Sequence, residues 1–214
     1  MEVIPVVNRE TVSDAKQCLK ILENFSSRVS RVHFDVGVPP VSTIRIPLFP
    51  QVFEAYKDTF SFELHCMVPE TLFFSRAHRA PGVARVYYHL DEIHDAERFE
   101  RQLLSWRKQG IDVGVVVRSS DLLKNIVLPK SVRSVLVLSV VPGRAGQKFH
   151  TRAWKVISFL KEKYPRVILT VDGGITPPIV KKLAKLGVSR VTSATYIWES
   201  KKPEEAYRKL VESD

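Results

Sequence analysis

The sequence predicts an α/β fold, a closed (β/α)8 barrel of eight parallel strands, on three observations. Apolar, β-branched runs alternate with helical patterns along all 214 residues. There are eight such strand–helix units, the number that closes a parallel barrel. Two of the strand-to-helix junctions, at 142–147 and 172–174, carry the glycines that such tight connections need. A doubly wound open sheet is the competing arrangement, and the count of eight favours the barrel.

The predicted strands are Val3–Val7, Arg31–Val36, Ser61–Met67, Ala84–Leu90, Ile111–Val117, Val132–Val140, Arg166–Val171 and Ser189–Ser193. The predicted helices are Val12–Phe25, Phe49–Tyr56, Pro69–Arg76, Ala96–Gln109, Asp121–Ile126, Arg152–Lys163, Pro177–Leu186 and Pro203–Val211. Gly110 and Gly187 each follow a helical pattern, as helix-terminating glycines do. Pro177 and Pro178 fit the first turn of a helix, where a missing N–H is tolerated. Four prolines within 39–50 predict an irregular loop.

The composition predicts a single domain, residues 1–214, because no linker or low-complexity stretch divides the chain. Hydrophobic content of 44% and charged content of 26% are typical of globular proteins. No apolar run reaches the roughly 18 residues that cross a bilayer, so we expect no membrane partner. The chain has no basic-then-apolar leader, and its two cysteines do not suggest a disulfide framework. We therefore expect a cytoplasmic protein.

The formal net charge is +10, from 33 Lys and Arg against 23 Asp and Glu. Such an excess attracts nucleic acid or steers anionic metabolites. The basic residues are dispersed and are not interleaved with aromatic residues, which argues against a nucleic-acid partner. The sequence leaves a homo-oligomer open.

Four titratable side chains lie toward the carboxyl ends of predicted strands, where parallel barrels place their reactive groups. They are His33 and Asp35 on the second strand, His65 on the third and Asp172 on the seventh. His33 and Asp35 are two residues apart and share one face of their strand, with Val32 and Phe34 facing the helices. Two imidazoles and two carboxylates at one mouth predict a divalent transition-metal site. A lone strand histidine such as His89 is more typical of a hydrogen-bonded structural residue.

The second and seventh strands are three positions apart in an eight-stranded ring, so Asp35 and Asp172 approach a small substrate from opposite sides. Two carboxylates on opposite faces of a carbon suit inversion of a stereocentre next to a carbonyl. The charge that develops on the substrate oxygens needs a nearby cation, which the metal supplies. Gly173 and Gly174 follow Asp172 and leave backbone N–H groups available for an anion such as a phosphate.

The chain resembles the ribulose-phosphate 3-epimerase family, which is metal-dependent and has a TIM-barrel fold. The stretch 139–149 (SVVPGRAGQKF) is similar to the family's S/T-V-x-P-G-F-G-G-Q-K-F, and 171–175 (VDGGI) matches its V-D-G-G-V/I. Residues 32–36 (VHFDV) resemble its H-x-D-V, and 64–67 (LHCM) its H-L-M. The resemblance covers nearly the whole chain.

The resemblance implies that His33, Asp35, His65 and Asp172 bind one divalent ion, which could be zinc, iron, manganese or cobalt. It implies that Asp35 and Asp172 also form the catalytic acid–base pair, and that Met67 belongs to the substrate wall. The implied phosphate and substrate contacts are Gly143, Gly146, Gln147, Gly173, Gly174, Ala194 and Thr195.

The chain departs from the family at the substrate wall. After Asp35 and Val36 the family has M-D-G-H-F-V-P-N, whereas this chain has only GVPP at 37–40. Val6 stands where the family has a serine that touches the substrate, and Leu138 where it often has methionine. Ala194 replaces a glycine, which it can do without strain if its φ is negative.

The leading hypothesis is a metal-dependent 3-epimerase of a phosphorylated ketose, converting D-ribulose 5-phosphate to D-xylulose 5-phosphate. One alternative is the same chemistry on a six-carbon substrate of the allulose 6-phosphate type, since the shortened loop could enlarge the pocket. Another is a retired barrel kept as a binding module. A decarboxylase or aldolase of the orotidine-phosphate type is disfavoured. Those enzymes have a D-x-K-x-x-D pattern on a strand, and this chain has no lysine after Asp35.

Overall fold

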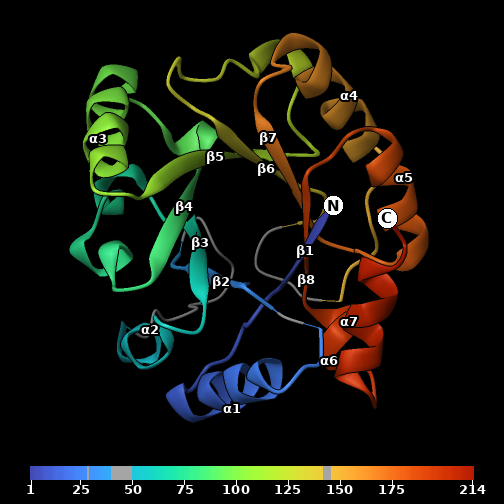
Figure 1. Cartoon of the computed structure of the whole chain (residues 1–214). Helices are drawn as coiled ribbons and strands as arrows, with labels where there is room; N and C mark the ends of the chain where they lie inside the picture. The colour runs from blue at the N-terminus through green and yellow to red at the C-terminus, as the bar shows by residue number, and fades with distance from the viewer. Residues whose placement is uncertain (28, 40–49, 142–145) are drawn as a thin grey trace.

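A ring of eight parallel strands, surrounded by helices, forms the centre of the protein in a computed structural model that describes residues 1–27, 29–39, 50–141 and 146–214 (Figure 1). The strand order is β1-β8-β7-β6-β5-β4-β3-β2. The ring closes between β1 and β2 at the Val6–His33 bridge, where Val7 N–H donates to the His33 carbonyl at 2.8 Å. The strands are β1 (Glu2–Pro5), β2 (Arg31–Gly37), β3 (Ser61–Met67), β4 (Val83–His89), β5 (Asp112–Arg118), β6 (Ser134–Leu138), β7 (Ile168–Asp172) and β8 (Arg190–Ser193). The predicted barrel is confirmed.

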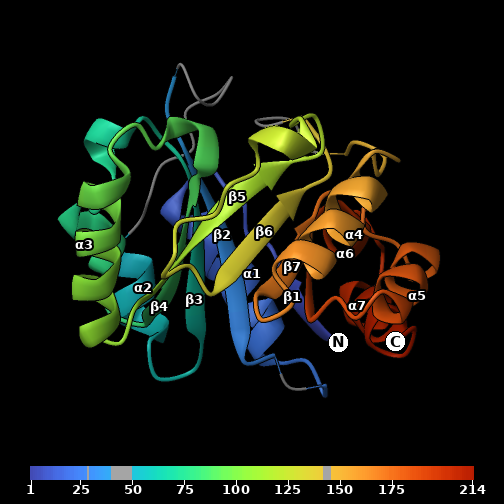
Figure 2. The same cartoon turned by 90° about the horizontal axis from the view of Figure 1, so that it is seen from above.

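The helices lie outside the strands, as Figure 2 shows from above. They are α1 (Val12–Glu23), α2 (Pro50–Tyr56), α3 (Ala96–Lys108), α4 (Ala153–Lys163), α5 (Pro177–Lys185), α6 (Thr195–Trp198) and α7 (Pro203–Val211). Thr11 caps α1 by accepting the Asp14 N–H, and prolines occupy the first turn of α5. Gly110 and Gly187 follow α3 and α5 with φ of +85° and +70°, so their predicted role in ending helices is confirmed.

Two predicted helices are wrong. The segment predicted as Pro69–Arg76 contains the 3₁₀ turn Glu70–Leu72 and the start of another, Arg76–Arg79; Asp121–Ile126 contains only the turn Leu123–Asn125. Phe74, with φ of 60°, separates the first two turns and interrupts any helix there. After β5, the Asp121 carboxylate accepts the Arg118 N–H and guanidinium, which folds the chain into a turn instead. Most of the loop predicted at 39–50 lies outside the described residues.

The core has two parts because β2 and its neighbours alternate inward and outward. Outside the ring, Phe34, Phe53 and Phe62 pack with ring centroids 4.8–5.8 Å apart and seal α2 against β2 and β3. A smaller apolar cluster is Tyr87, Val116, Leu136 and Leu138. As predicted, Val32 and Phe34 join the core outside the ring. The alternating residues His33 and Asp35 point to the inside of the barrel.

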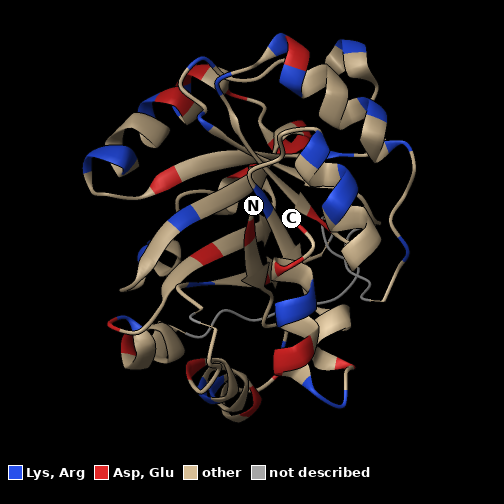
Figure 3. Cartoon of the chain, turned by 45° about the vertical axis from the view of Figure 1, so that its right-hand side comes forward, with Lys and Arg blue, Asp and Glu red and all other residues tan. Residues whose placement is uncertain are grey.

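The outer surface carries charges of both signs. Figure 3 shows Lys and Arg spread over several helices and loops, with Asp and Glu between them. The two termini lie side by side, joined by an ion pair between the Met1 amino group and Asp214 (Figure 1). Both cysteines, Cys18 and Cys66, are buried and free. Within the described residues, no helix has the length and apolar character needed to span a membrane.

Candidate active site

The register between β2 and β3 brings three of the predicted metal ligands together. It sets Asp35 beside His65, and neighbouring strands lie about 4.8 Å apart. His65 Nδ1 is 3.0 Å from Asp35 Oδ1, and His33 Nε2 is 3.6 Å from the same oxygen. One ligand atom from each of the three residues lies within 4.8 Å of the others. The predicted clustering of His33, Asp35 and His65 is therefore present.

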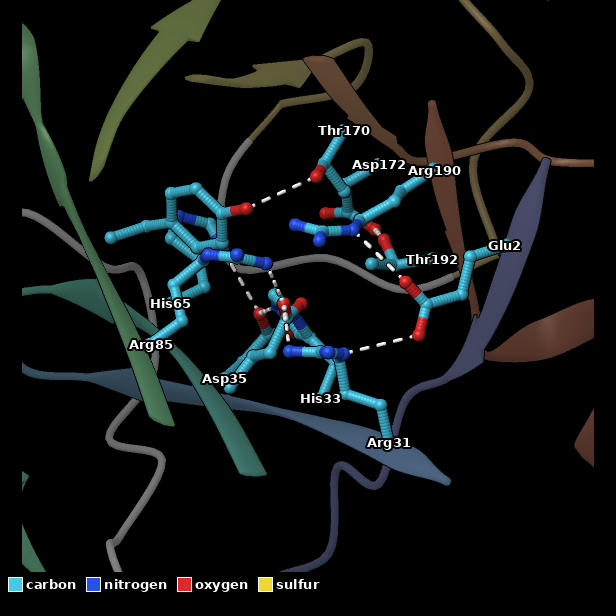
Figure 4. A network of polar contacts seen from close by, with 12 residues as sticks. Glu2, Arg31, His33, Asp35, His65, Arg85, Thr170, Asp172, Arg190 and Thr192 are labelled. Carbon is cyan, nitrogen blue, oxygen red and sulfur yellow. Dashed lines mark hydrogen bonds and ion pairs between the residues drawn. The ribbon is translucent and has the colours of Figure 1, made fainter. Parts of the chain in front are cut away.

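Asp172 lies on the other side of the barrel, at the carboxyl end of β7. Thr192, its register partner on β8, donates its hydroxyl to Asp172 Oδ1 at 2.6 Å. Asp172 is outside the three-residue group that lies within 4.8 Å. Figure 4 shows Asp172 and Thr192 on one side and His33, Asp35 and His65 on the other. The strand order puts β2 and β7 three positions apart, as expected for two carboxylates that face each other.

The pKa values of the two carboxylates are shifted in opposite directions. Burial alone would raise the pKa of Asp35, but His33 and His65 hold it well below its usual range. Burial, reinforced by the negative charge of Asp35, raises the pKa of Asp172. Burial would lower the pKa of His33, yet the neighbouring carboxylates of Asp35 and Glu63, each 3.6 Å away, raise it above its usual value. One acid is thus poised as a base and the other as a proton carrier.

A cavity of about 960 Å³ opens above these side chains. Of the predicted site residues, its lining includes Asp35, His65, Met67, Gly146, Gln147, Asp172, Gly173, Gly174, Ala194 and Thr195. His33 is fully buried and is not among the lining residues. Gly143 lies outside the described residues. The cavity also borders Val6 and Leu138, two of the positions at which the chain departs from the family pattern.

The glycines after β7 adopt a conformation that other residues avoid. Gly173 and Gly174 have φ of +99° and +61°, and a Cβ on Gly174 would lie 2.1 Å from the Phe149 nitrogen. Ala194 has φ of −104°, so alanine fits there without that strain. Among the described residues, the amides of Gly174 and Ala194 have no backbone acceptor. Both amides belong to residues that line the cavity, and they can hold an anion.

Gly146 and Gln147 brace the neighbouring loop. Gly146 N–H donates to the Thr195 hydroxyl at 3.1 Å. The Gln147 side-chain amide donates to the Val141 carbonyl at 2.8 Å and accepts the Val141 N–H at 3.2 Å. These two contacts tie the loop after β6 to itself and to the start of α6.

Sequence reasoning missed or underrated three residues. Asn8 donates its amide to Asp35 Oδ2 and accepts the Asp35 N–H at 3.2 Å. His89 Nε2 lies 2.9 Å from His65 Nε2, so this structural histidine supports a predicted ligand directly. Glu63 faces His33 from β3. The positions of two of them could have indicated their place in the site. Asn8 follows β1, and Glu63 precedes His65 by two residues on the same face of β3.

The chain is similar to proteins of one known family. The model of the ribulose-phosphate 3 epimerase family matches residues 12–198. A ribulose-phosphate 3-epimerase of Helicobacter pylori is 31% identical over 144 residues, which are 65% of this chain and 65% of the relative. That of Schizosaccharomyces pombe is 26% identical over 151 residues, 70% of this chain and 64% of the relative. The chain thus spans just under two thirds of these two relatives.

Among solved structures, 3-hexulose-6-phosphate synthase from Salmonella typhimurium superposes with a TM-score of 0.72 at 17% identity, over 100% of this chain and 98% of the other. Orotidine 5'-phosphate decarboxylase from Pyrococcus horikoshii gives 0.66 at 11% identity, over 99% and 98%. At these identities the likeness shows the shared barrel fold alone. The sequence matches are more specific, and they show that this chain belongs to the ribulose-phosphate 3-epimerase family.

Proposed function

We propose that this protein is a metal-dependent epimerase that inverts C3 of a phosphorylated ketose, with D-ribulose 5-phosphate and D-xylulose 5-phosphate as its substrate pair. The observation that carries the proposal is the pair of carboxylates, Asp35 and Asp172, on opposite sides of one cavity with pKa values moved in opposite directions. Membership of the family supports it.

The donor set fits a divalent ion. His33, Asp35 and His65 offer two imidazole nitrogens and a carboxylate oxygen, a combination that suits zinc, iron, manganese or cobalt. His33 Nε2 is buried without a hydrogen-bond partner among the described residues, which fits a nitrogen that binds a metal ion. When bound, the ion supplies positive charge beside the substrate oxygens. Asp172 would complete the set from the opposite side.

The proton transfers belong to the two aspartates. Asp35, whose pKa is lowered, takes the C3 proton from one face of the substrate, and Asp172, whose pKa is raised, delivers a proton to the other face. The roles reverse in the return direction. Asn8 holds Asp35 by two hydrogen bonds, so the carboxylate keeps one orientation.

The phosphate of the substrate is held by backbone N–H groups. Gly174 lies in the loop between β7 and α5, two residues before the N-cap Thr176, and Ala194 and Thr195 lie at the start of α6. These amides border the same cavity as the aspartates, at its β7–β8 side.

The predicted cytoplasmic location remains part of this proposal. A rice relative, 26% identical over 184 residues (83% of this chain and 75% of the relative), is named as a cytoplasmic isoform.

The test is an epimerase assay with D-ribulose 5-phosphate, before and after removal of metal with a chelator. We expect turnover that is lost on chelation and restored by one of the four candidate ions. Parallel assays with D-allulose 6-phosphate decide between five- and six-carbon substrates. A metal-replete protein that neither epimerises these ketoses nor exchanges their C3 proton with deuterium oxide would exclude the proposal and favour the retired barrel.

A further inference from the structure

Two buried polar atoms face each other directly behind the proposed metal ligands. His33 Nδ1 and Glu63 Oε2 are 3.6 Å apart, and both side chains are fully buried. Neither atom has a hydrogen-bond partner among the described residues. A buried polar atom without a hydrogen-bond partner destabilises the folded state, so pairing of these two atoms is favoured.

The β2–β3 register places this contact. It aligns His33 with Glu63 and, two residues on, Asp35 with His65. The same register therefore presents His33 Nε2 toward Asp35 and His33 Nδ1 toward Glu63. The 3.6 Å between Nδ1 and Oε2 is only slightly longer than a hydrogen bond.

Glu63 is itself held from behind. Arg85 and Arg31 both donate to its other oxygen, Oε1, the second at 3.5 Å. Arg85 is anchored in turn by Asp112 at 2.8 Å. Oε1 is thus occupied, and Oε2 is left to accept a hydrogen bond from the N–H at His33 Nδ1.

From this geometry we infer that Glu63 is a positioning residue, which keeps a proton on His33 Nδ1 and so reserves Nε2 for the metal ion. The inference rests on the proposed metal site. A histidine ligand whose second nitrogen donates to a carboxylate has a fixed ring orientation and binds its metal more tightly. His65 differs, because the group behind it is the imidazole of His89.

The informative variant is Glu63→Gln, since it has almost the same shape. Arg85 and Arg31 require an acceptor at the Oε1 position, so the amide oxygen must take that place. The NH2 group then faces His33 and forces Nδ1 to accept a hydrogen bond. The proton moves to Nε2, the nitrogen that the ion needs.

Two readouts test the inference on the full-length protein. Zn²⁺ affinity, measured on metal-free protein by competition with a chromophoric chelator, should fall about 10–100-fold in Glu63→Gln. The ¹⁵N signal of His33 Nδ1 in metal-free protein should change from a protonated to an unprotonated nitrogen. Asp112→Asn is the matched control: it removes a carboxylate from the same Arg85 but does not face His33, and it should leave both readouts unchanged.

The outcomes separate this inference from the proposed function. If Glu63→Gln binds Zn²⁺ as tightly as Asp112→Asn does and keeps a protonated Nδ1, the inference is wrong. If the wild-type protein binds no metal ion, the metal-dependent function fails, and the Nδ1 signal alone decides whether Glu63 fixes the proton. Urea unfolding of each variant checks that the barrel is intact.

Discussion

The barrel has two polar layers of similar composition and opposite organisation. The base network consists of Glu2, Arg31, Glu63, Arg85, Asp112 and Arg190. In it, positive and negative groups alternate: Glu2 pairs with Arg190 and Arg31, and Glu63 with Arg31 and Arg85. The mouth group consists of His33, Asp35, His65 and Asp172. Its acids meet imidazoles or a hydroxyl, and in the described part of the chain neither forms an ion pair with Arg or Lys.

The difference teaches what each layer does. Opposite charges that face each other across strands satisfy one another and need nothing further. At the mouth, two carboxylates share a buried region without an Arg or Lys partner among the described residues, and burial together with the charge of Asp35 raises the pKa of Asp172. Charge neutralised within the protein is structural, whereas charge left unneutralised is available to a metal ion and a substrate.

The largest expected effect is the loss of activity when a mouth carboxylate is removed. Asp35→Asn and Asp172→Asn should each lower the epimerisation rate about 10²–10⁴-fold, since each removes one proton-transfer group. Asp172→Asn should not destabilise the protein, because burial beside Asp35 disfavours its charge, whereas Asp35→Asn should lower stability because it removes the carboxylate that His33 and His65 hold ionised. Metal content must be measured on both variants first. An Asp35→Asn enzyme that retains metal and epimerises at the wild-type rate would refute the two-carboxylate scheme.

Removal of a positive charge from the base network should lower the stability of the protein rather than its activity. Arg85→Met leaves Glu63 with a weaker cationic partner and should lower the free energy of unfolding by about 3–5 kcal/mol. Urea denaturation followed by circular dichroism measures it. Arg101→Ala, which breaks the exposed Arg101–Glu97 pair, is the control and should cost no more than about 1 kcal/mol. Equal losses in the two variants would mean that the base network is not a closed structural unit.

Substitution of one glycine at each end of the barrel should affect different properties of the protein. Gly174→Ala at the mouth would push a Cβ to 2.1 Å from the Phe149 nitrogen and must displace the loop. We expect the KM for the phosphorylated ketose to rise at least about tenfold, or about 1.4 kcal/mol of binding. Gly187→Ala, at a similar positive φ, would meet only the mobile end of Lys161, at 3.3 Å. Its effect should be confined to about 1 kcal/mol of stability, with KM unchanged; equal KM changes would place the phosphate elsewhere.

The smallest effect concerns pH and lies outside both layers. Burial lowers the pKa of His78, which bonds to the Tyr88 hydroxyl at 2.9 Å, from 6.5 to about 4. Because the folded pKa is depressed, the stability it contributes is present above pH 6.5 and lost as the pH falls toward 4. Between about pH 6.5 and 5.5 the loss should be about 1 kcal/mol. In His78→Gln this part of the pH dependence should disappear from thermal unfolding curves; if the slope is unchanged, His78 is not its source.

Much of the fold could be predicted from local pattern. Alternating β-branched and helical stretches identify all eight strands, because burial of a parallel strand requires a continuous apolar run. The predictions of helices after β3 and β5 were wrong, although they used the same local pattern of apolar residues as the correct predictions. Apolar residues such as Phe73 and Phe74 resemble a helical face, yet they pack around Tyr88 from a chain that turns at Phe74. Such packing is not local.

The residues of the candidate site could be predicted from their positions in the chain. His33, Asp35, His65 and Asp172 each lie at or near the carboxyl end of a strand, and parallel strands bring those ends to one mouth. Only the tertiary structure decided how they are grouped. The β2–β3 register puts Asp35 against His65 and leaves Asp172 with Thr192, and the closure of the ring brings Asn8 to Asp35. Registers and closure depend on strands far apart in the chain, so no local pattern encodes which polar atoms meet or which pKa values move.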